Sequence, residues 1–218
     1  MENGRTPAVL RLFVAISLPE EVKERVEKAQ QQLLRAVPKN LVRWTKREQF
    51  HLTLKFLGNV AQTRVGELIE ALRFACRGAE ALRLRAERIG FFPGARVPRV
   101  LWIGVHDEKN ALPEVQRIVE ASVANFGEIP GLAAGPAASS PAGRQRSQEK
   151  AFTGHITLGR IQRIRRSEAE SLSKAVSGIA ELFFGEWTAN HIELIRSELL
   201  SGGSRYTTLA EVPLLVKT

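Results

Sequence analysis

The chain has 218 residues, of which 44% are hydrophobic and 25% are charged, as in an ordinary globular protein. No apolar run approaches the roughly 20 residues that a membrane span requires, so we expect no membrane segment. Lys and Arg outnumber Asp and Glu by 32 to 23, a net charge of +9 that favours a polyanionic partner such as nucleic acid. An arginine-rich composition without such a partner explains the same charge.

The chain opens with an apolar stretch at residues 9–18 that Arg11 interrupts, and no signal-peptide cleavage site follows it. This stretch predicts the first strand of the fold. The single cysteine, Cys76, lies on an apolar helical face and forms neither an intramolecular disulfide nor a zinc cluster. We therefore predict a reducing, cytoplasmic location.

A helix is predicted after the first strand, beginning at a capping box formed by Ser17 and Glu20. Apolar residues then recur at helical spacing and predict an inward face: Val22, Val26, Ala29 and Leu33.

Residues 50–56, Phe-His-Leu-Thr-Leu-Lys-Phe, alternate between polar and apolar side chains, which predicts a strand. Leu52, Leu54 and Phe56 are expected on one face of it. His51 and Thr53 then share the opposite face.

A helical pattern follows Gly58, and then come strand-like runs at residues 82–92 and 99–105. The same order recurs after His155, where a helix is expected to open at a capping box of Ser167 and Glu170. Strands near residues 187–195 and 205–212 complete this second unit. A further helix is predicted between the two units from Leu112, Val115, Val119, Ser122, Val123 and Phe126.

The spacing of the two units also agrees. His51 and Trp102 are separated by 51 residues, as are His155 and Tyr206. An internal duplication is therefore predicted, with Trp102 and Tyr206 at equivalent points. Residues 131–151 between the units are rich in Ala, Gly, Pro and Ser and predict a mobile loop.

Each unit begins with a His-x-Thr-Leu motif, at residues 51–54 and 155–158. The spacing puts an imidazole and a hydroxyl on one strand face, about 7 Å apart. If the units pack with approximate twofold symmetry, both pairs converge on one cleft. One histidine can then activate water while the other protonates a leaving oxygen, and the threonine hydroxyls of Thr53 and Thr157 can hold phosphate oxygens.

The sequence lacks the motifs of metal-dependent enzymes and of enzymes that use nucleoside triphosphates. The four histidines occur without an HExxH motif, a recognised His–carboxylate spacing or a cysteine cluster, so we predict no metal and no cofactor. His106 and His191 are expected to be structural or exposed residues. Trp44 and Tyr206 suit either base stacking or packing.

The segments HLTLKFLG at 51–58 and HITLGR at 155–160 strongly resemble the two signatures of the 2H phosphoesterase superfamily. More narrowly, the chain resembles the LigT-like RNA 2',3'-cyclic phosphodiesterases, also called 2'-5' RNA ligases. The resemblance extends to RLFVAISLPEEV near the start and IELIRSELLSGGSRYTTL near the end. Gly154, before the second motif, stands where relatives often have proline, which is expected to loosen the approach of that strand.

The resemblance implies an α+β fold with two pseudo-symmetric lobes, in which antiparallel sheets line a central cleft and helices lie outside. Residues 1–218 would form a single bilobal domain. It also implies hydrolysis of a terminal 2',3'-cyclic phosphate to a 2'-phosphate, with His51 as proton donor and His155 as proton acceptor. Thr53 and Thr157 match the phosphate-contacting threonines.

Arg160 follows the second motif as in many relatives, but strand alternation puts it on the face of Ile156 and Leu158. A direct role in phosphate binding therefore stays open. The expected partner is an RNA with a cyclic phosphate end, such as a tRNA half, acted on by a monomer. Ligation of RNA ends through a 2'-5' bond in the same site and a noncatalytic RNA-binding module are the alternatives.

Overall fold

The computed structural model describes residues 8–127, 152–162, 164–179, 182–201 and 203–216. The loop predicted at residues 131–151 lies outside these residues. The nine strands in them are β1 Val9–Ser17, β2 Val42–Trp44, β3 His51–Ala61, β4 Leu82–Phe92, β5 Val100–His106, β6 His155–Ile161, β7 Phe183–Ala189, β8 His191–Leu200 and β9 Gly203–Pro213. The helices are α1 Glu20–Ala36, α2 Val65–Ala75, α3 Ala111–Ser122 and α4 Arg166–Ser177, with 3₁₀ turns η1 Arg47–Gln49 and η2 Gln62–Arg64.

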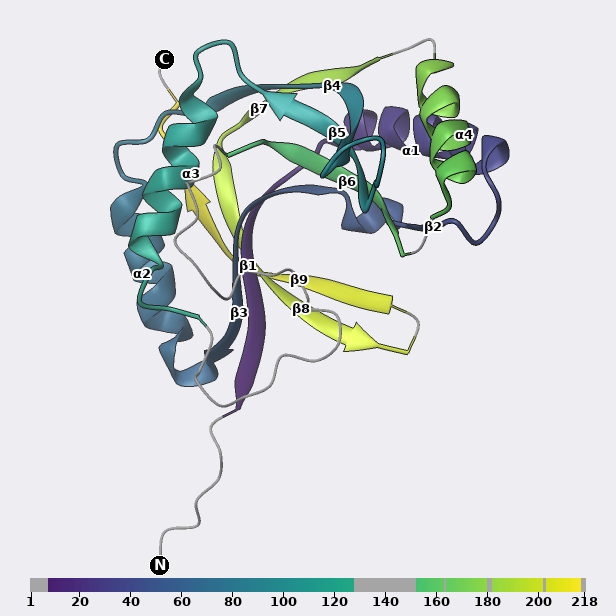
Figure 1. The fold of residues 1–218 in the computed structure, drawn as a ribbon. Coiled ribbons are helices and arrows are strands. Elements are labelled where there is room, and N and C mark those ends of the chain that lie inside the picture. The colour runs from purple at the N-terminus through teal and green to yellow at the C-terminus, as the bar shows by residue number, and fades with distance from the viewer. Residues whose placement is uncertain (1–7, 128–151, 163, 180–181, 202, 217–218) are drawn as a thin grey trace, which may run out of the picture.

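The strands form one curled antiparallel sheet in the order β7-β4-β5-β6-β3-β1-β8-β9, with β2 added beside β6 (Figure 1). This order is symmetric about the junction of β6 and β3, so each half contains one motif strand followed by three neighbours. The predicted α+β class with two related lobes is confirmed, and the two lobes share a continuous sheet.

The lobes do not correspond to consecutive halves of the chain. Strands β4 and β5, which follow the first motif, pair with each other and β5 pairs with β6 of the second motif. Conversely, β8, which follows the second motif, pairs with β1, and β1 pairs with β3 of the first motif. Helices α2 and α3 contact each other and cover the half of the sheet that contains β3. Helices α1 and α4 contact each other and cover the half that contains β7 (Figure 1). Each lobe is thus assembled from both units.

This exchange changes the predicted equivalence of Trp102 and Tyr206. Trp102 in β5 pairs with Thr157, whereas the residue that pairs with Thr53 is Ala15 in β1. Ala15 is therefore the counterpart of Trp102 in the symmetric sheet. The equivalence read from the common spacing of 51 residues is wrong, because spacing along the chain does not record which lobe a strand joins.

Two predicted helix starts are also wrong. Helix α1 begins at Glu20 after Pro19 and has no side-chain cap, since Ser17 is the last residue of β1. Helix α4 begins at Arg166, so Ser167 lies in its first turn, and the Glu168 carboxylate accepts a 2.7 Å hydrogen bond from the Arg165 backbone N–H. At α1 the end of β1 and Pro19 decided the start, and at α4 the Glu168 contact comes two residues before the expected partner Glu170.

Both motif strands contain a β-bulge at the leucine that follows the threonine. In β3, Thr53 pairs with Ala15 and Lys55 with Val14, which leaves Leu54 as an extra residue. In β6, Thr157 pairs with Trp102 and Gly159 with Leu101, which leaves Leu158 extra. A bulge shifts the alternation of side chains by one residue.

The bulge in β6 is held by side-chain contacts from α1. The Leu158 carbonyl accepts hydrogen bonds from the Thr45 backbone N–H at 2.9 Å and from Gln30 Nε2 at 2.9 Å. Gln30 Nε2 also donates to the Thr45 carbonyl at 2.8 Å. One glutamine amide thus joins the bulge, the segment after β2 and the outer helix.

Replacing Gln30 with alanine is expected to lower the free energy of unfolding by about 1–3 kcal/mol, because two partly buried carbonyls lose a donor. Urea unfolding monitored by circular dichroism measures this change. Gln31→Ala is the matched control, since Gln31 is exposed in the same helix and the helix-propensity change is the same. Equal stability of the two variants would show that the Gln30 contacts contribute nothing.

Candidate active site

The two motif strands meet at the centre of the sheet. β3 and β6 pair through Leu52 and Ile156, which are buried on the helix-covered side. In antiparallel order this pair places His51 toward Thr157 and Thr53 toward His155 on the opposite, cleft-facing side. The sheet therefore brings together both predicted His-Thr pairs, which are 104 residues apart in the chain.

Both imidazoles are anchored in the same way. His51 Nδ1 lies 2.7 Å from the Gln49 carbonyl oxygen, and His155 Nδ1 lies 2.8 Å from the Thr153 carbonyl oxygen. A carbonyl accepts only, so each neutral ring carries its proton on Nδ1 and has its lone pair on Nε2. Each Nε2 is then free to accept a proton as a base or, once protonated, to give one as an acid.

Burial sets the proton affinity of both rings. Desolvation lowers the pKa of His51 to about 4, against the hydrogen bond to Gln49, which raises it. The positive charges of His155 and Arg160 lower the pKa of His51 further, while Glu193 raises it. Desolvation likewise lowers the pKa of His155, with the Thr153 carbonyl opposing and Arg160 adding to the effect. The site thus resists two imidazolium charges at once.

Aromatic rings pack against each histidine. The His51 ring lies 4.9 Å from the Phe13 ring and 5.5 Å from the Tyr206 ring, between ring centroids. His155 contacts Phe92 edge-on at 5.0 Å. These rings exclude water from the sides of the imidazoles and restrict their orientation.

The bulge at Leu158 decides where Arg160 points. Leu158 and Gly159 are both buried, so the next exposed position, Arg160, falls on the face of His155 and Thr157. Its charge acts on His51, His155 and Tyr206. The alternation that put Arg160 with Ile156 and Leu158 is therefore wrong.

The bulge at Leu54 has the same consequence for Phe56. This ring was predicted on the core side with Leu52 and Leu54, but it is 61% exposed and lies 5.8 Å from the Phe13 ring on the cleft side. Val100 pairs with Arg160 as Phe13 pairs with Phe56, so the arginine and the phenylalanine occupy equivalent positions in the two lobes.

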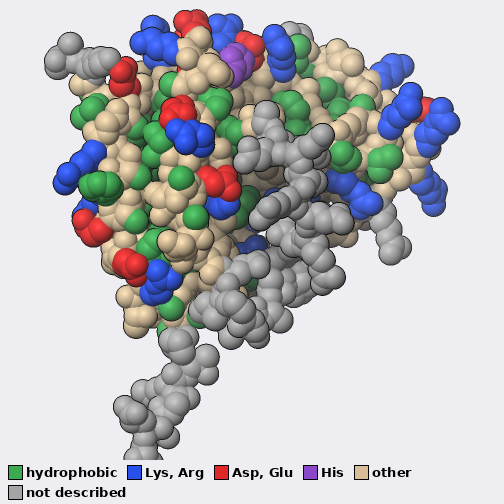
Figure 2. All heavy atoms as spheres, turned by 60° about the vertical axis from the view of Figure 1, so that its left-hand side comes forward, with side chains coloured by type: hydrophobic (Ala, Val, Ile, Leu, Met, Phe, Trp, Pro, Cys, Tyr) green, Lys and Arg blue, Asp and Glu red, His purple; other side chains and the backbone are tan. Residues whose placement is uncertain are grey.

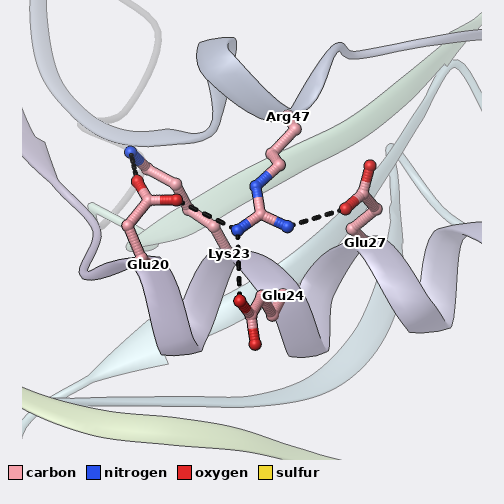
Figure 3. A network of polar contacts seen from close by, with 5 residues as sticks. All are labelled: Glu20, Lys23, Glu24, Glu27 and Arg47. Carbon is pink, nitrogen blue, oxygen red and sulfur yellow. Dashed lines mark hydrogen bonds and ion pairs between the residues drawn. The ribbon is translucent and has the colours of Figure 1, made fainter.

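An ion-pair network fixes the turn that anchors His51. Arg47, the first residue of η1, contacts three carboxylates on one face of α1 (Figure 3): Glu27 at 2.8 Å, Glu20 at 3.0 Å and Glu24 at 3.6 Å. Gln49, which holds His51 through its carbonyl, is the last residue of the same turn. Helix α1 thus positions His51 of β3 through η1.

The remaining aromatic and histidine candidates lie in different places, some packed against the core and some at strand ends. Trp44 packs against the hydrophobic core beside Gly159, so the packing interpretation fits this ring better than base stacking. Tyr206 faces the cleft next to His51. His106 is half exposed at the end of β5, 3.5 Å from Glu87, and His191 opens β8, 3.5 Å from Glu193.

Gly154 tightens the approach of its strand rather than loosening it. Its backbone carbonyl accepts a 2.8 Å hydrogen bond from the Val105 N–H. A Cβ built on Gly154 would lie 2.4 Å from the Val105 carbonyl oxygen, which is too close for any other residue without movement. The glycine allows the β5–β6 contact that carries His155.

Sequence reasoning missed two charged residues near the site. Arg43 in β2 pairs in register with Arg160, which puts a second arginine beside it. Glu193 in β8 is buried and pairs with Ala15, the partner of Thr53. Neither residue has a local motif, and only the strand pairing reveals them.

Within the part of the chain that the structure describes, no group of three or more His, Cys, Asp or Glu side chains is arranged to hold a metal ion. No helix in this part has the length and apolar character to cross a bilayer.

Comparisons with known proteins place the chain beside one group of relatives. The curated RNA 2',3'-cyclic phosphodiesterase of Methanocaldococcus jannaschii is 27% identical over 202 residues, which cover 93% of this chain and 99% of the relative. The protein of the same name from Aquifex aeolicus is 28% identical over 203 residues, covering 93% of this chain and 96% of the relative.

Solved structures show the same fold. The protein TT0787 of Thermus thermophilus superposes with a TM-score of 0.67 at 26% identity, covering 94% of this chain and 98% of that one. E. coli LigT complexed with 3'-AMP gives a TM-score of 0.66 at 22% identity, covering 95% and 99%. The model of the family LigT like Phosphoesterase matches residues 16–102 and 135–206 of the chain. The chain therefore belongs to this family.

Proposed function

We propose that this protein hydrolyses the 2',3'-cyclic phosphate at an RNA end to a 2'-phosphate, by metal-independent acid-base catalysis with two histidines. The observation that carries the proposal is the pair of matched imidazoles, each held through Nδ1 by the carbonyl two residues before it. A binding module has no need for two titratable rings with free Nε2 atoms.

In this reaction His155 Nε2 takes a proton from water as the water oxygen bonds to phosphorus. The bond between phosphorus and O3' breaks, and His51 gives its proton to O3'. Thr53, Thr157 and Arg160 supply donors for the nonbridging oxygens, where negative charge gathers in the transition state. The assignment of His51 as donor and His155 as acceptor follows the resemblance to the family.

The names of the relatives support hydrolysis of a cyclic phosphodiester by this chain, since they match almost its full length. The basic net charge fits an RNA substrate. A tRNA half as substrate, a monomeric state, a cytoplasmic location and a single domain over residues 1–218 stay predictions.

Wild-type protein is expected to hydrolyse an oligonucleotide with a cyclic phosphate end in the presence of EDTA. His51→Ala and His155→Ala should each lower kcat by at least about a hundredfold, because each removes one proton-transfer group. Chromatography of the 2'-phosphate product measures the rates, with His106→Ala as a control. Unchanged turnover in both site variants, or loss of wild-type activity in EDTA, would contradict the mechanism.

Arg160→Gln is expected to lower kcat/KM by roughly ten- to a hundredfold, because one charged fork of donors to the phosphate is lost. Arg160→Lys should recover only part of this loss. Arg73→Gln is the matched control, since Arg73 lies on the outer helix α2 and, among the described residues, forms an ion pair with Glu70 alone. If Arg160→Gln and Arg73→Gln behave alike, Arg160 has no part in phosphate binding.

A further inference from the structure

A cavity of about 430 Å³ lies beside His51, between η1 and the end of the β8–β9 hairpin. Two of its lining residues also touch the histidine: Gln49 holds Nδ1 through its carbonyl, and Tyr206 contacts the ring edge-on. The volume falls in the range of sites that bind small organic ligands. This cavity therefore adjoins the site on the His51 side.

The chemistry of the proposed function determines what lies on that side. In an in-line displacement the attacking water and the leaving oxygen stand on opposite sides of phosphorus. Water enters on the side of His155, so the leaving O3' and the ribose that carries it lie on the side of His51. The RNA chain continues from the 5' oxygen of that ribose and must leave the cleft from the same side.

The residues of the cavity suit a single-stranded nucleotide. Tyr206 offers an aromatic ring, Leu200 an apolar surface, and Ser204 a hydroxyl. Single-strand sites combine such rings with cations that follow the backbone. Lys46 is exposed at the wall of the cavity, and among the described residues no carboxylate lies within ion-pair distance of it.

The other charges of the cavity are largely committed elsewhere. Arg205 donates to the Glu198 carboxylate at 2.9 and 3.1 Å, which neutralises much of its charge. Glu48 contributes one carboxylate to the lining. On the outer face covered by α2 and α3, basic and acidic side chains are interspersed where the described residues are visible (Figure 2). Among the residues that line the cavity, Lys46 is thus a cation available to RNA.

We propose that this cavity binds the nucleotide on the 5' side of the cyclic phosphate nucleotide in a single-stranded RNA, with Lys46 contacting the phosphodiester between the two. The proposal rests on the proposed function. It makes the enzyme a preferential hydrolase of oligonucleotide ends over free cyclic mononucleotides.

The test compares kcat/KM for adenosine 2',3'-cyclic phosphate with that for the trinucleotide ApApA ending in the same group. Wild-type protein should prefer the trinucleotide. Lys46→Glu should lower the ratio of trinucleotide to mononucleotide kcat/KM by about tenfold, the scale of one charged contact. Lys28→Glu, an equal charge reversal at an exposed position of α1, should leave the ratio unchanged.

A ratio that stays the same in Lys46→Glu would overturn the proposal while the proposed function stands. Failure of wild-type protein to hydrolyse either substrate would contradict the function itself. Salt dependence gives a second readout: the log of trinucleotide kcat/KM should fall less steeply with log salt in Lys46→Glu, by about 0.7 for one phosphate contact.

Discussion

The architecture depends on how the two motif strands join. β3 and β6 meet through Leu52 and Ile156 alone, and the leucine after each threonine is an extra residue in its strand. The bulge keeps that leucine in the core and turns the next exposed side chain toward the cleft. An uninterrupted strand would bury Phe56 and Arg160 or expose the core leucines. The site therefore requires two irregular strands in a regular sheet.

Matched backbone anchors give the histidines the same orientation, while their environments make them different. Each ring is held at Nδ1 by a carbonyl of its own chain segment, which leaves Nε2 for chemistry. Desolvation lowers the pKa of both rings, so neither carries a charge easily in the cleft. An anionic phosphate favours the imidazolium form, and the buried Glu193 acts in the same direction on His51 alone.

The positive charge of the chain is used unevenly. Arg47 is surrounded by glutamates of α1 and serves to hold η1. Arg43 and Arg160 are neighbours in register at the cleft, and Lys46 borders the adjoining cavity. Cations at the cleft without strong ion pairs can bind phosphate without first breaking a contact. The net charge of +9 therefore says less about phosphate binding than does the set of cations that have no carboxylate partner.

The sequence by itself determined the local features: the two His-x-Thr pairs, the amphipathic helices, the span of β4, and a fold of the LigT-like kind. The motifs, the helices and the span of β4 follow from periodicity and residue type within a few positions of the chain, whereas the fold was implied by the resemblance of the motifs to the family. Tertiary structure alone decided the exchange of strands between lobes, the cleft-facing positions of Phe56 and Arg160, and the place of Glu193. Each depends on which strands pair and in which register, and a bulge reverses alternation only because a partner strand lacks the matching residue.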